Sequence, residues 1–364
     1  MSVFAAKSFR NHELVAFHQD PDSGLSAIIA IHSTALGPAL GGCRYWSYDS
    51  DEDALDDVLR LSRGMTYKAA LAGLSFGGGK AVIMAPKDSS KDAKKSPELL
   101  QAFGRFVHSL NGQYITAEDV GTCPDDMEIV HGNTPYVAGI ADGGAGDGDP
   151  SPATAYGVFH GLQAAVRARM GRNDLTGVHV AVQGLGHVGG YLAQYLGDAG
   201  ARLTVADLDA DRLAWARDTL GADVVAADAI YGVAADVFAP NAMGAILNDD
   251  TIPRLNACVV AGSANNQLAE DRHGTSLADR GILYAPDYVI NAGGIISISH
   301  EGRAYNRDEA MAHCARIGDT LSEIFQRAGN EQRPTNEVAD QLAEERVIAH
   351  GKAKKERRLS AVAG

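Results

Sequence analysis

Short runs of β-branched and apolar residues alternate with helical periodicities in the first part of the chain. A period of two residues indicates a strand, and apolar positions three and four residues apart indicate one face of a helix. Residues 36–44 are rich in glycine and proline and predict a loop. The predicted strands are Leu25 to His32, Lys80 to Ala85 and Tyr114 to Ala117, and the predicted helices begin at Asp51, Pro97 and near Pro124.

The same alternation continues in the second half, where short strands recur at the spacing of an α/β protein. A helix is predicted from Ala153 to Met170, and a charged helix from Asn336 to Arg358. After Gly294, a helix with Ile295 and Ile298 one turn apart is typical of ordinary core packing. The predicted strands are Val178 to Val182, Arg202 to Ala206, Ala222 to Val225, Asp236 to Phe238, Cys258 to Ala261 and Ile282 to Tyr284.

The segment 143–152 interrupts this periodicity with glycine, aspartate and proline. Because 364 residues are enough for two domains, we interpret the segment as a hinge. The expected architecture is α/β with two domains separated by a cleft.

A formal net charge of −14 and a pI near 5.2 argue against nucleic acid or an anionic membrane as the main partner. The chain shows no signal-peptide pattern and no run of about 18 apolar residues, so we expect a cytoplasmic protein without a membrane span. The four scattered cysteines indicate reduced thiols. The histidines lack ligand spacing, so no metal site is predicted.

The most specific local pattern is a strand followed by Gly184, Gly186 and Gly189 and then by a helix through Leu196. Such glycines let a pyrophosphate approach the helix N-terminus, and Asp207, after the next strand, stands where an acid binds the adenosine ribose. The alternative is a tight strand-to-helix turn that binds no ligand, but such a turn would not explain the acid at Asp207. The acid favours NAD over NADP, although Arg202 and Arg212 leave some NADP tolerance open.

A second pattern combines Lys68 with Lys80, which follows three glycines directly. Two ammonium groups in one pocket repel each other, so that one loses its proton more readily and can act as a base. The alternative is a glycine turn that ends in a surface lysine. A phosphate-binding P-loop is rejected, because Leu74 replaces its first glycine and Ala81 follows the lysine.

Asp119 lies just after a predicted strand, at the kind of sheet edge where α/β proteins bind ligands. A carboxylate there is a candidate acid or base. It could equally cap the helix that begins near Pro124, and the residues alone leave both interpretations open.

Five blocks in the expected order, covering nearly the whole chain, resemble the amino-acid dehydrogenases that act on glutamate, leucine, phenylalanine and valine, most of all the leucine-type members. The blocks are Leu40-Gly41-Gly42, Gly64 to Lys68, Gly77 to Lys80, Thr116 to Thr122 and Ala285 to Gly294.

The resemblance implies an NAD-dependent oxidative deamination with defined roles. Lys68 would hold the substrate carboxylate with Gly41 and Met65 beside it, Lys80 would be the general base acting through a water, and Asp119 would exchange protons with the amino group. Asn266 would hold substrate and cofactor in register. The implied cofactor-binding residues are Thr154 at the nicotinamide amide, Gly184, Gly186, His187, Val188, Gly189, Asp207, Ala239, Asn241, Ala261 and Asn266.

The resemblance also assigns the two domains. Residues 1–149 plus 331–364 would bind substrate and form the oligomer, commonly an octamer, and residues 150–330 would form a Rossmann-type NAD-binding domain. Closure about the linker would expel water from the reacting groups.

The implied side-chain pocket is apolar, which argues against glutamate and favours branched aliphatic substrates. Its wall would be Leu40, Ala117, Ile295 and Ile298. Hydrophobic pockets discriminate by only about 1–3 kcal/mol per methylene, so phenylalanine and tryptophan stay open. Asn241 departs from the leucine-type pattern, which usually has cysteine there.

A rival hypothesis is a catalytically inactive NAD-binding regulator. Such a protein would keep the glycines and Asp207 but lose Lys68, Lys80 or Asp119, and all three are present.

Overall fold

The computed structural model describes residues 3–87, 94–140, 149–301 and 305–362, with the side chains given as far as residue 353. The chain divides into two compact units, Met1–Gly148 with Ala343–Gly364 and Asp149–Leu342. The predicted hinge at 143–152 lies largely outside the described residues.

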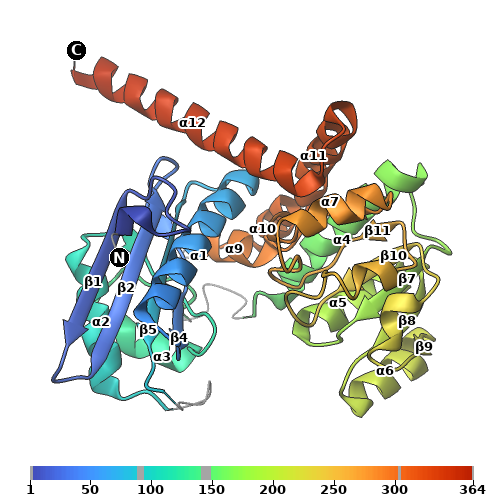
Figure 1. Cartoon of the computed structure of the whole chain (residues 1–364), viewed down its shortest axis with the longest axis horizontal. Helices are drawn as coiled ribbons and strands as arrows, with labels where there is room; N and C mark the ends of the chain where they lie inside the picture. Colours follow the sequence, from blue (N-terminus) through green and yellow to red (C-terminus); the bar gives the residue numbers. More distant parts are fainter. Residues whose placement is uncertain (1–2, 88–93, 141–148, 302–304, 363–364) are drawn as a thin grey trace. The chain divides into compact units, whose positions relative to one another are not determined.

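The first unit is built on a mixed six-stranded sheet in the order β1-β2-β5-β3-β6, with β4 paired to β5 (Figure 1). Strands β1 and β2 run antiparallel to their neighbours, whereas β3, β4 and β6 are parallel to β5 or to each other. The elements are β1 (Leu14–Asp20), β2 (Leu25–Ser33), β3 (Ala39–Leu40), β4 (Cys43–Trp46), β5 (Gly77–Met84) and β6 (Tyr114–Ile115), with the helices α1 (Asp51–Leu71), α2 (Pro97–Ser109) and α3 (Pro124–His131) and a short 3₁₀ turn η1 (Val3–Ala5).

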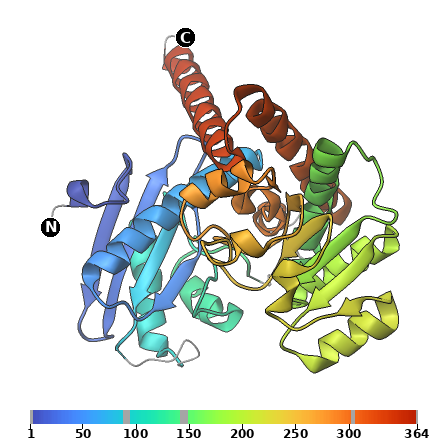
Figure 2. The same cartoon turned by 45° about the vertical axis from the view of Figure 1, so that its right-hand side comes forward.

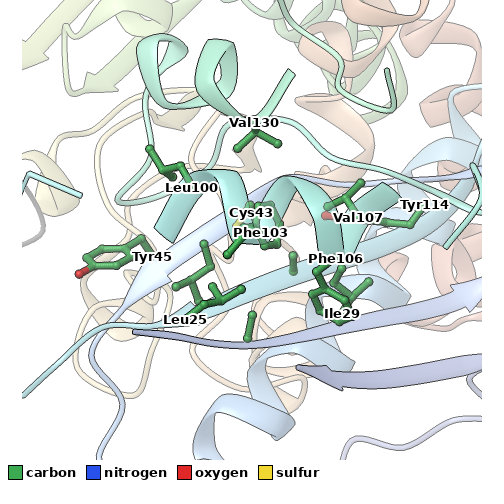
Figure 3. Close-up of a cluster of buried hydrophobic side chains, with 14 of the residues drawn as sticks. Leu25, Ile29, Cys43, Tyr45, Leu100, Phe103, Phe106, Val107, Tyr114 and Val130 are labelled. Carbon is green, nitrogen blue, oxygen red and sulfur yellow. The ribbon is translucent and has the colours of Figure 1, made fainter. Parts of the chain in front are cut away.

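The two faces of this sheet are covered by different helices, because successive strand residues point to opposite sides. Ile28, Ala30 and Val82 pack under α1, which Figure 2 shows lying across the sheet. Figure 3 shows the other face, where Phe103 and Phe106 of α2 belong to a cluster with strand residues and with Val130 of α3. The hydroxyls of Ser50 and Ser96 cap the first turns of α1 and α2.

One expectation for this unit was wrong, and one of two open alternatives is excluded. Residues 36–44 contain β3 and the start of β4, short strands whose pairing partners lie elsewhere in the sequence and which local composition therefore does not reveal. Gly77, Gly78 and Gly79 form no turn, because they begin β5, where they are buried. A Cβ on Gly78 would lie 2.0 Å from the Thr66 nitrogen, so glycine is needed there for close approach of α1 rather than for a left-handed backbone.

The second unit has a fully parallel sheet in the order β12-β11-β10-β7-β8-β9. Numbered from its first strand, this is the 3-2-1-4-5-6 order of a Rossmann fold, with its switch point between β7 and β10. Figure 1 shows β10, β7, β8 and β9 side by side. The strands are β7 (His179–Gln183), β8 (Arg202–Ala206), β9 (Asp223–Val224), β10 (Val237–Pro240), β11 (Val259–Val260) and β12 (Leu283–Tyr284).

Nine helices are described in whole or part within this unit, together with the 3₁₀ turns η2 (Ala229–Gly232) and η3 (Ile252–Arg254). The helix predicted from Ala153 begins two residues earlier, and the one predicted after Gly294 begins at Gly293. The nine described helices are α4 (Ser151–Met170), α5 (His187–Asp198), α6 (Ala210–Leu220), α7 (Arg272–Asp279), α8 (Asp287–Ile290), α9 (Gly293–Ser299), α10 (Arg307–Ala315), α11 (Ile317–Glu331) and α12 (Thr335–Val362).

The last helix, α12, passes from the second unit into the first. In the first unit, Glu344 accepts a hydrogen bond from the Tyr67 hydroxyl at 2.5 Å, and Arg346 donates to the Leu71 carbonyl at 3.1 Å. Both contacts tie the end of the chain to α1. Within the described part of the chain, none of the helices has both the length and the apolar character that a membrane span needs.

Candidate active site

The first unit contains a buried ion pair between Lys80 and Asp119. Lys80 Nζ lies 3.0 Å from Asp119 Oδ1, and the two side chains are 6% and 23% exposed. Lys80 lies on β5 on the same face as Val82, which α1 covers, and Asp119 follows β6. The lysine is thus no surface residue, and Asp119 does not cap α3, whose capping box is formed by Cys123 and Asp126.

Close backbone packing brings these two side chains together. A Cβ on Gly41 would lie 1.8 Å from the Gly79 carbonyl oxygen, and one on Gly42 would lie 2.8 Å from Asp119 Cβ. Strand β3 places Leu40 between Gly78 and Ile115, so the two glycines pass directly between the strands that carry the ion pair. Of the residues predicted for the substrate, Leu40, Gly41 and Ala117 are buried in this region.

Lys68 and Met65 belong to the C-terminal half of α1, and both are half-buried. Thr66, between them in the sequence, is the residue that touches Gly78. Helix α1 therefore lies over the part of β5 that leads into Lys80. That Lys68 and Lys80 share one pocket stays a prediction. The structure shows an ion pair between Lys80 and Asp119.

Two cations share the Asp119 carboxylate. Arg44 Nε donates to Asp119 Oδ2 at 3.1 Å, while Lys80 holds Oδ1. Burial alone would raise the pKa of Asp119, but the charges and hydrogen bonds of Lys80 and Arg44 outweigh it, so that the pKa lies below its usual range. The carboxylate is therefore ionised at neutral pH. Burial raises the pKa of the adjacent Cys43 well above its usual range, which keeps this thiol protonated.

Sequence reasoning missed Arg44 and Asp57. Arg44 Nη1 donates to Asp57 Oδ2 at 2.8 Å. A signal for Asp57 was present, since it follows the buried Ala54 by three positions and so lies beside the apolar face of α1. Arg44 lies in β4, two residues after the glycine pair that separates β3 from β4, but nothing local predicts which carboxylates it meets.

In the second unit, the glycine-rich turn connects β7 to α5 at the switch point of the sheet. Gly184 has a left-handed backbone with φ 88°, and a Cβ on Gly189 would lie 2.1 Å from the Gly184 carbonyl oxygen. Only glycine fits both positions. His187 and Val188 form the first turn of α5, and Gly186 is its N-cap, so free backbone N–H groups are available there for a phosphate.

Asp207 follows β8, as predicted, and contacts the same turn. Its Oδ2 accepts from the Leu185 N–H at 2.5 Å and its Oδ1 accepts from the Asp209 N–H at 2.9 Å. Burial would raise the pKa of Asp207, but these backbone hydrogen bonds prevail and lower it. The ionised carboxylate retains lone pairs for sugar hydroxyls, so turn and acid together fit a dinucleotide.

The loops after β10 and β11 meet at the same sheet edge. Asn241 Oδ1 accepts from both the backbone N–H and the hydroxyl of Ser263, at 2.9 and 2.8 Å. Asn241 Cβ also packs against Gly189. Ala239 and Ala261 are buried beneath these loops, whereas Asn266 is exposed and has a left-handed backbone with φ 51°. The cofactor residues predicted after these two strands thus adjoin the glycine turn or the loops beside it.

Thr154 and the isoleucine pair lie together elsewhere in this unit. The Thr154 hydroxyl donates to the Pro150 carbonyl at 2.9 Å and lies 3.1 Å from where a Gly294 Cβ would be. Ile295 is buried in α9, and Ile298, one turn later, is half-buried.

Among the described residues, Asp249, Glu270 and His273 bring their ligand atoms within 4.8 Å of one another. Arg272 already pairs with Asp249 and Glu270, at 2.6 and 3.1 Å. His273 Nδ1 accepts from the Glu270 N–H, so Nε2 carries the proton toward Asp249 and cannot ligate a metal there. The group is an ion-pair network.

Two family models match the chain, the Glu/Leu/Phe/Val dehydrogenase dimerisation domain over residues 12–136 and the Glutamate/Leucine/Phenylalanine/Valine dehydrogenase model over residues 143–211. Leucine dehydrogenase of Geobacillus stearothermophilus is 51% identical over 354 residues, which cover 97% of this chain and 95% of that relative. The chain belongs to the Glu/Leu/Phe/Val dehydrogenase family.

Other similar dehydrogenases carry different substrate names. Phenylalanine dehydrogenase of Caldalkalibacillus thermarum is 48% identical, with 95% of this chain and 94% of that relative covered. The crystal structure of L-tryptophan dehydrogenase from Nostoc punctiforme superposes with a TM-score of 0.85 at 45% identity, covering 94% of this chain and 97% of that one. The predicted two-domain α/β fold, the amino-acid dehydrogenase class and NAD as cofactor are therefore confirmed.

Proposed function

We propose that this dehydrogenase oxidatively deaminates a branched, leucine-like L-amino acid. The reaction would convert amino acid, NAD⁺ and water into the 2-oxo acid, ammonium, NADH and a proton, reversibly. The observation that carries this proposal is the buried Lys80–Asp119 pair beside Gly41 and Gly42, which can act as an acid–base couple. The identity to leucine dehydrogenase supports the choice of substrate.

In the first unit, Lys68 would hold the substrate carboxylate, with Gly41 and Met65 beside it. Asp119 would take a proton from the substrate ammonium, because a neutral amine lets hydride leave Cα more easily. Lys80, as the neutral amine, would then deprotonate the water that attacks the imino acid. Asp119 would release the proton that it took from the substrate, which is the proton of the overall reaction, and Lys80 would pass the protons of the water to the leaving ammonia. Their 3.0 Å separation supports action of both groups on one substrate.

In the second unit, the glycine turn and Asp207 would hold the cofactor, with Thr154, Asn241 and Asn266 nearer its nicotinamide half. Bound NAD⁺ supplies the hydride acceptor. The residues of the chain contribute binding and orientation, and the ionised Asp207 also repels a 2′-phosphate, which favours NAD over NADP.

The predicted wall of the side-chain pocket, Leu40, Ala117, Ile295 and Ile298, is apolar, and none of these residues can pair with a carboxylate. We therefore expect glutamate to be a poor substrate. Phenylalanine or tryptophan is the second candidate, favoured by the similarity to dehydrogenases of those names.

The test is NADH production at 340 nm and alkaline pH with leucine, valine, isoleucine, phenylalanine, tryptophan and glutamate in parallel. Highest kcat/KM with the branched aliphatic substrates supports the proposal. Highest kcat/KM with an aromatic substrate keeps the chemistry and overturns the pocket assignment. No turnover with any of the six, while NADH still binds by fluorescence, would favour the regulator.

We further propose that the enzyme is a cytoplasmic homo-oligomer. The dimerisation-domain model that matches residues 12–136 supports assembly, and the four free cysteines agree with a reducing compartment. Light scattering after gel filtration measures the assembly, and a monomeric mass would contradict it.

A further inference from the structure

Arg44 lies between two carboxylates and donates to both. Its Nε donates to Asp119 Oδ2 at 3.1 Å, and its Nη1 donates to Asp57 Oδ2 at 2.8 Å. The guanidinium is planar and its N–H groups have a fixed direction, so two simultaneous contacts fix its orientation. The side chain is 19% exposed, which limits the screening of both interactions by water.

Asp57 is itself anchored from both sides. The Tyr48 hydroxyl donates to Oδ2 at 2.8 Å, and Arg60 Nη2 donates to Oδ1 at 2.9 Å. The Asp57 side chain is 14% exposed and belongs to α1, whereas Arg44 belongs to β4. The result is a chain of alternating charge in which each carboxylate lies between two cations, in the order Lys80, Asp119, Arg44, Asp57 and Arg60.

This arrangement constrains the group that the proposed reaction uses. A carboxylate held at one oxygen can rotate about its Cβ–Cγ bond, but Asp119 is held at Oδ1 by Lys80 and at Oδ2 by Arg44. The oxygen that faces Lys80 therefore stays in place. Positioning of this kind has large kinetic effects, since a displacement of about 1 Å can cost on the order of 10²-fold in rate.

We propose that Arg44, anchored by Asp57, is a positioning residue that orients the Asp119 carboxylate for proton exchange with the substrate amino group. This inference rests on the proposed function, because it takes Asp119 as the group that exchanges that proton. A purely structural role would instead only tie β4 to α1.

The test compares Arg44→Gln, Arg44→Lys and Asp57→Asn with wild type in kcat, KM and the pH profile of kcat/KM for L-leucine. In Arg44→Gln, kcat should fall about 10- to 100-fold. The acidic limb of the pH profile of kcat/KM should move to higher pH, because the loss of one of its two neighbouring cations raises the pKa of Asp119. Arg44→Lys keeps the positive charge but lacks the planar guanidinium that contacts both carboxylates. Its acidic limb should therefore lie at the wild-type pH, while only part of the wild-type kcat is retained. Asp57→Asn removes the anchor and should lower kcat without moving the limb upward.

Arg105→Gln is the matched control, because it removes another arginine–aspartate pair of the same unit, 3.4 Å from Asp20. It should leave kcat and the limb unchanged. NADH binding and the melting temperature are measured on every variant. If Arg44→Gln does not fold, Arg44→Lys and Asp57→Asn carry the test.

Wild-type kcat and an unmoved limb in the Arg44 and Asp57 variants, with only the melting temperature lowered, would overturn the positioning role and leave the proposed function intact. A wild-type enzyme that oxidises no amino acid would overturn the proposed function itself and this inference with it.

Discussion

Lys80 Nζ lies 3.0 Å from Asp119 Oδ1, although the two residues come from different elements of the first unit. A buried ammonium without a partner costs several kcal/mol, so the fold depends on the carboxylate to stabilise this lysine. The carboxylate in turn is shared with Arg44. Stability and the proposed acid–base function are therefore coupled at Asp119.

The coupling predicts how Asp119→Asn changes stability with pH. The pKa of Asp119 is lowered in the folded protein, so its ionised form stabilises the fold above the unfolded value of about 3.9 and ceases to do so as pH falls through the folded value. At pH 7 the substitution should cost about 2–4 kcal/mol of unfolding free energy. The difference in melting temperature from wild type should shrink between pH 6 and pH 3. A constant difference over that range would show that the ionised carboxylate is not the stabilising group.

Gly78→Ala should strongly destabilise the first unit, by about 3 kcal/mol or more, because the added Cβ would lie 2.0 Å from the Thr66 nitrogen and force α1 away from β5. Gly64→Ala is the matched control. Gly64 lies within α1, and a Cβ there meets no atom within 4 Å, so alanine should stabilise by about 0.5–1 kcal/mol. Thermal denaturation measures both. Equal melting temperatures for the two variants would contradict the packing argument.

The periodicity predicted the main strands and helices because their burial is local and regular. The strand Arg202 to Ala206 is confirmed to the residue, and β2 and α2 nearly so. It failed at β3, a two-residue strand whose existence depends on β5 and β6. The sequence also left a turn at Gly77 to Gly79 open, because glycine that permits close packing cannot be told in sequence from glycine that permits a left-handed backbone.

For the site, motif spacing brought out Lys80, Asp119 and Asp207, whose neighbours along the chain are informative. It could not pair them, because an ion pair such as Lys80–Asp119 depends on strand order. Arg44 and Asp57 were missed for the same reason, since each acquires its partner only when β4 and α1 pack together.

Asp207→Ala should weaken NAD binding about 10- to 100-fold and change the amino-acid KM much less, because hydrogen bonds to a charged group contribute about 1.5–3 kcal/mol. Fluorescence titration with NADH and steady-state kinetics measure the two effects. Asp207→Asn removes the negative charge but keeps an oxygen that can accept a hydrogen bond, so it separates the two contributions to NAD binding. Asp207 also accepts from the Leu185 N–H, so melting temperatures are compared to detect loss of the turn itself. Equal effects on cofactor and amino acid would mean that the acid does not bind the ribose.

The central claim is that Lys80 acts as the base in amino-acid oxidation, and Lys80→Ala tests it most directly. NADH formation from L-leucine is measured beside NADH binding and the melting temperature. Turnover should fall by about 10²–10⁴-fold while NADH binds nearly as in wild type, because the lysine lies in the first unit and the dinucleotide turn in the second. A variant that keeps even about a tenth of the wild-type rate would contradict the claim.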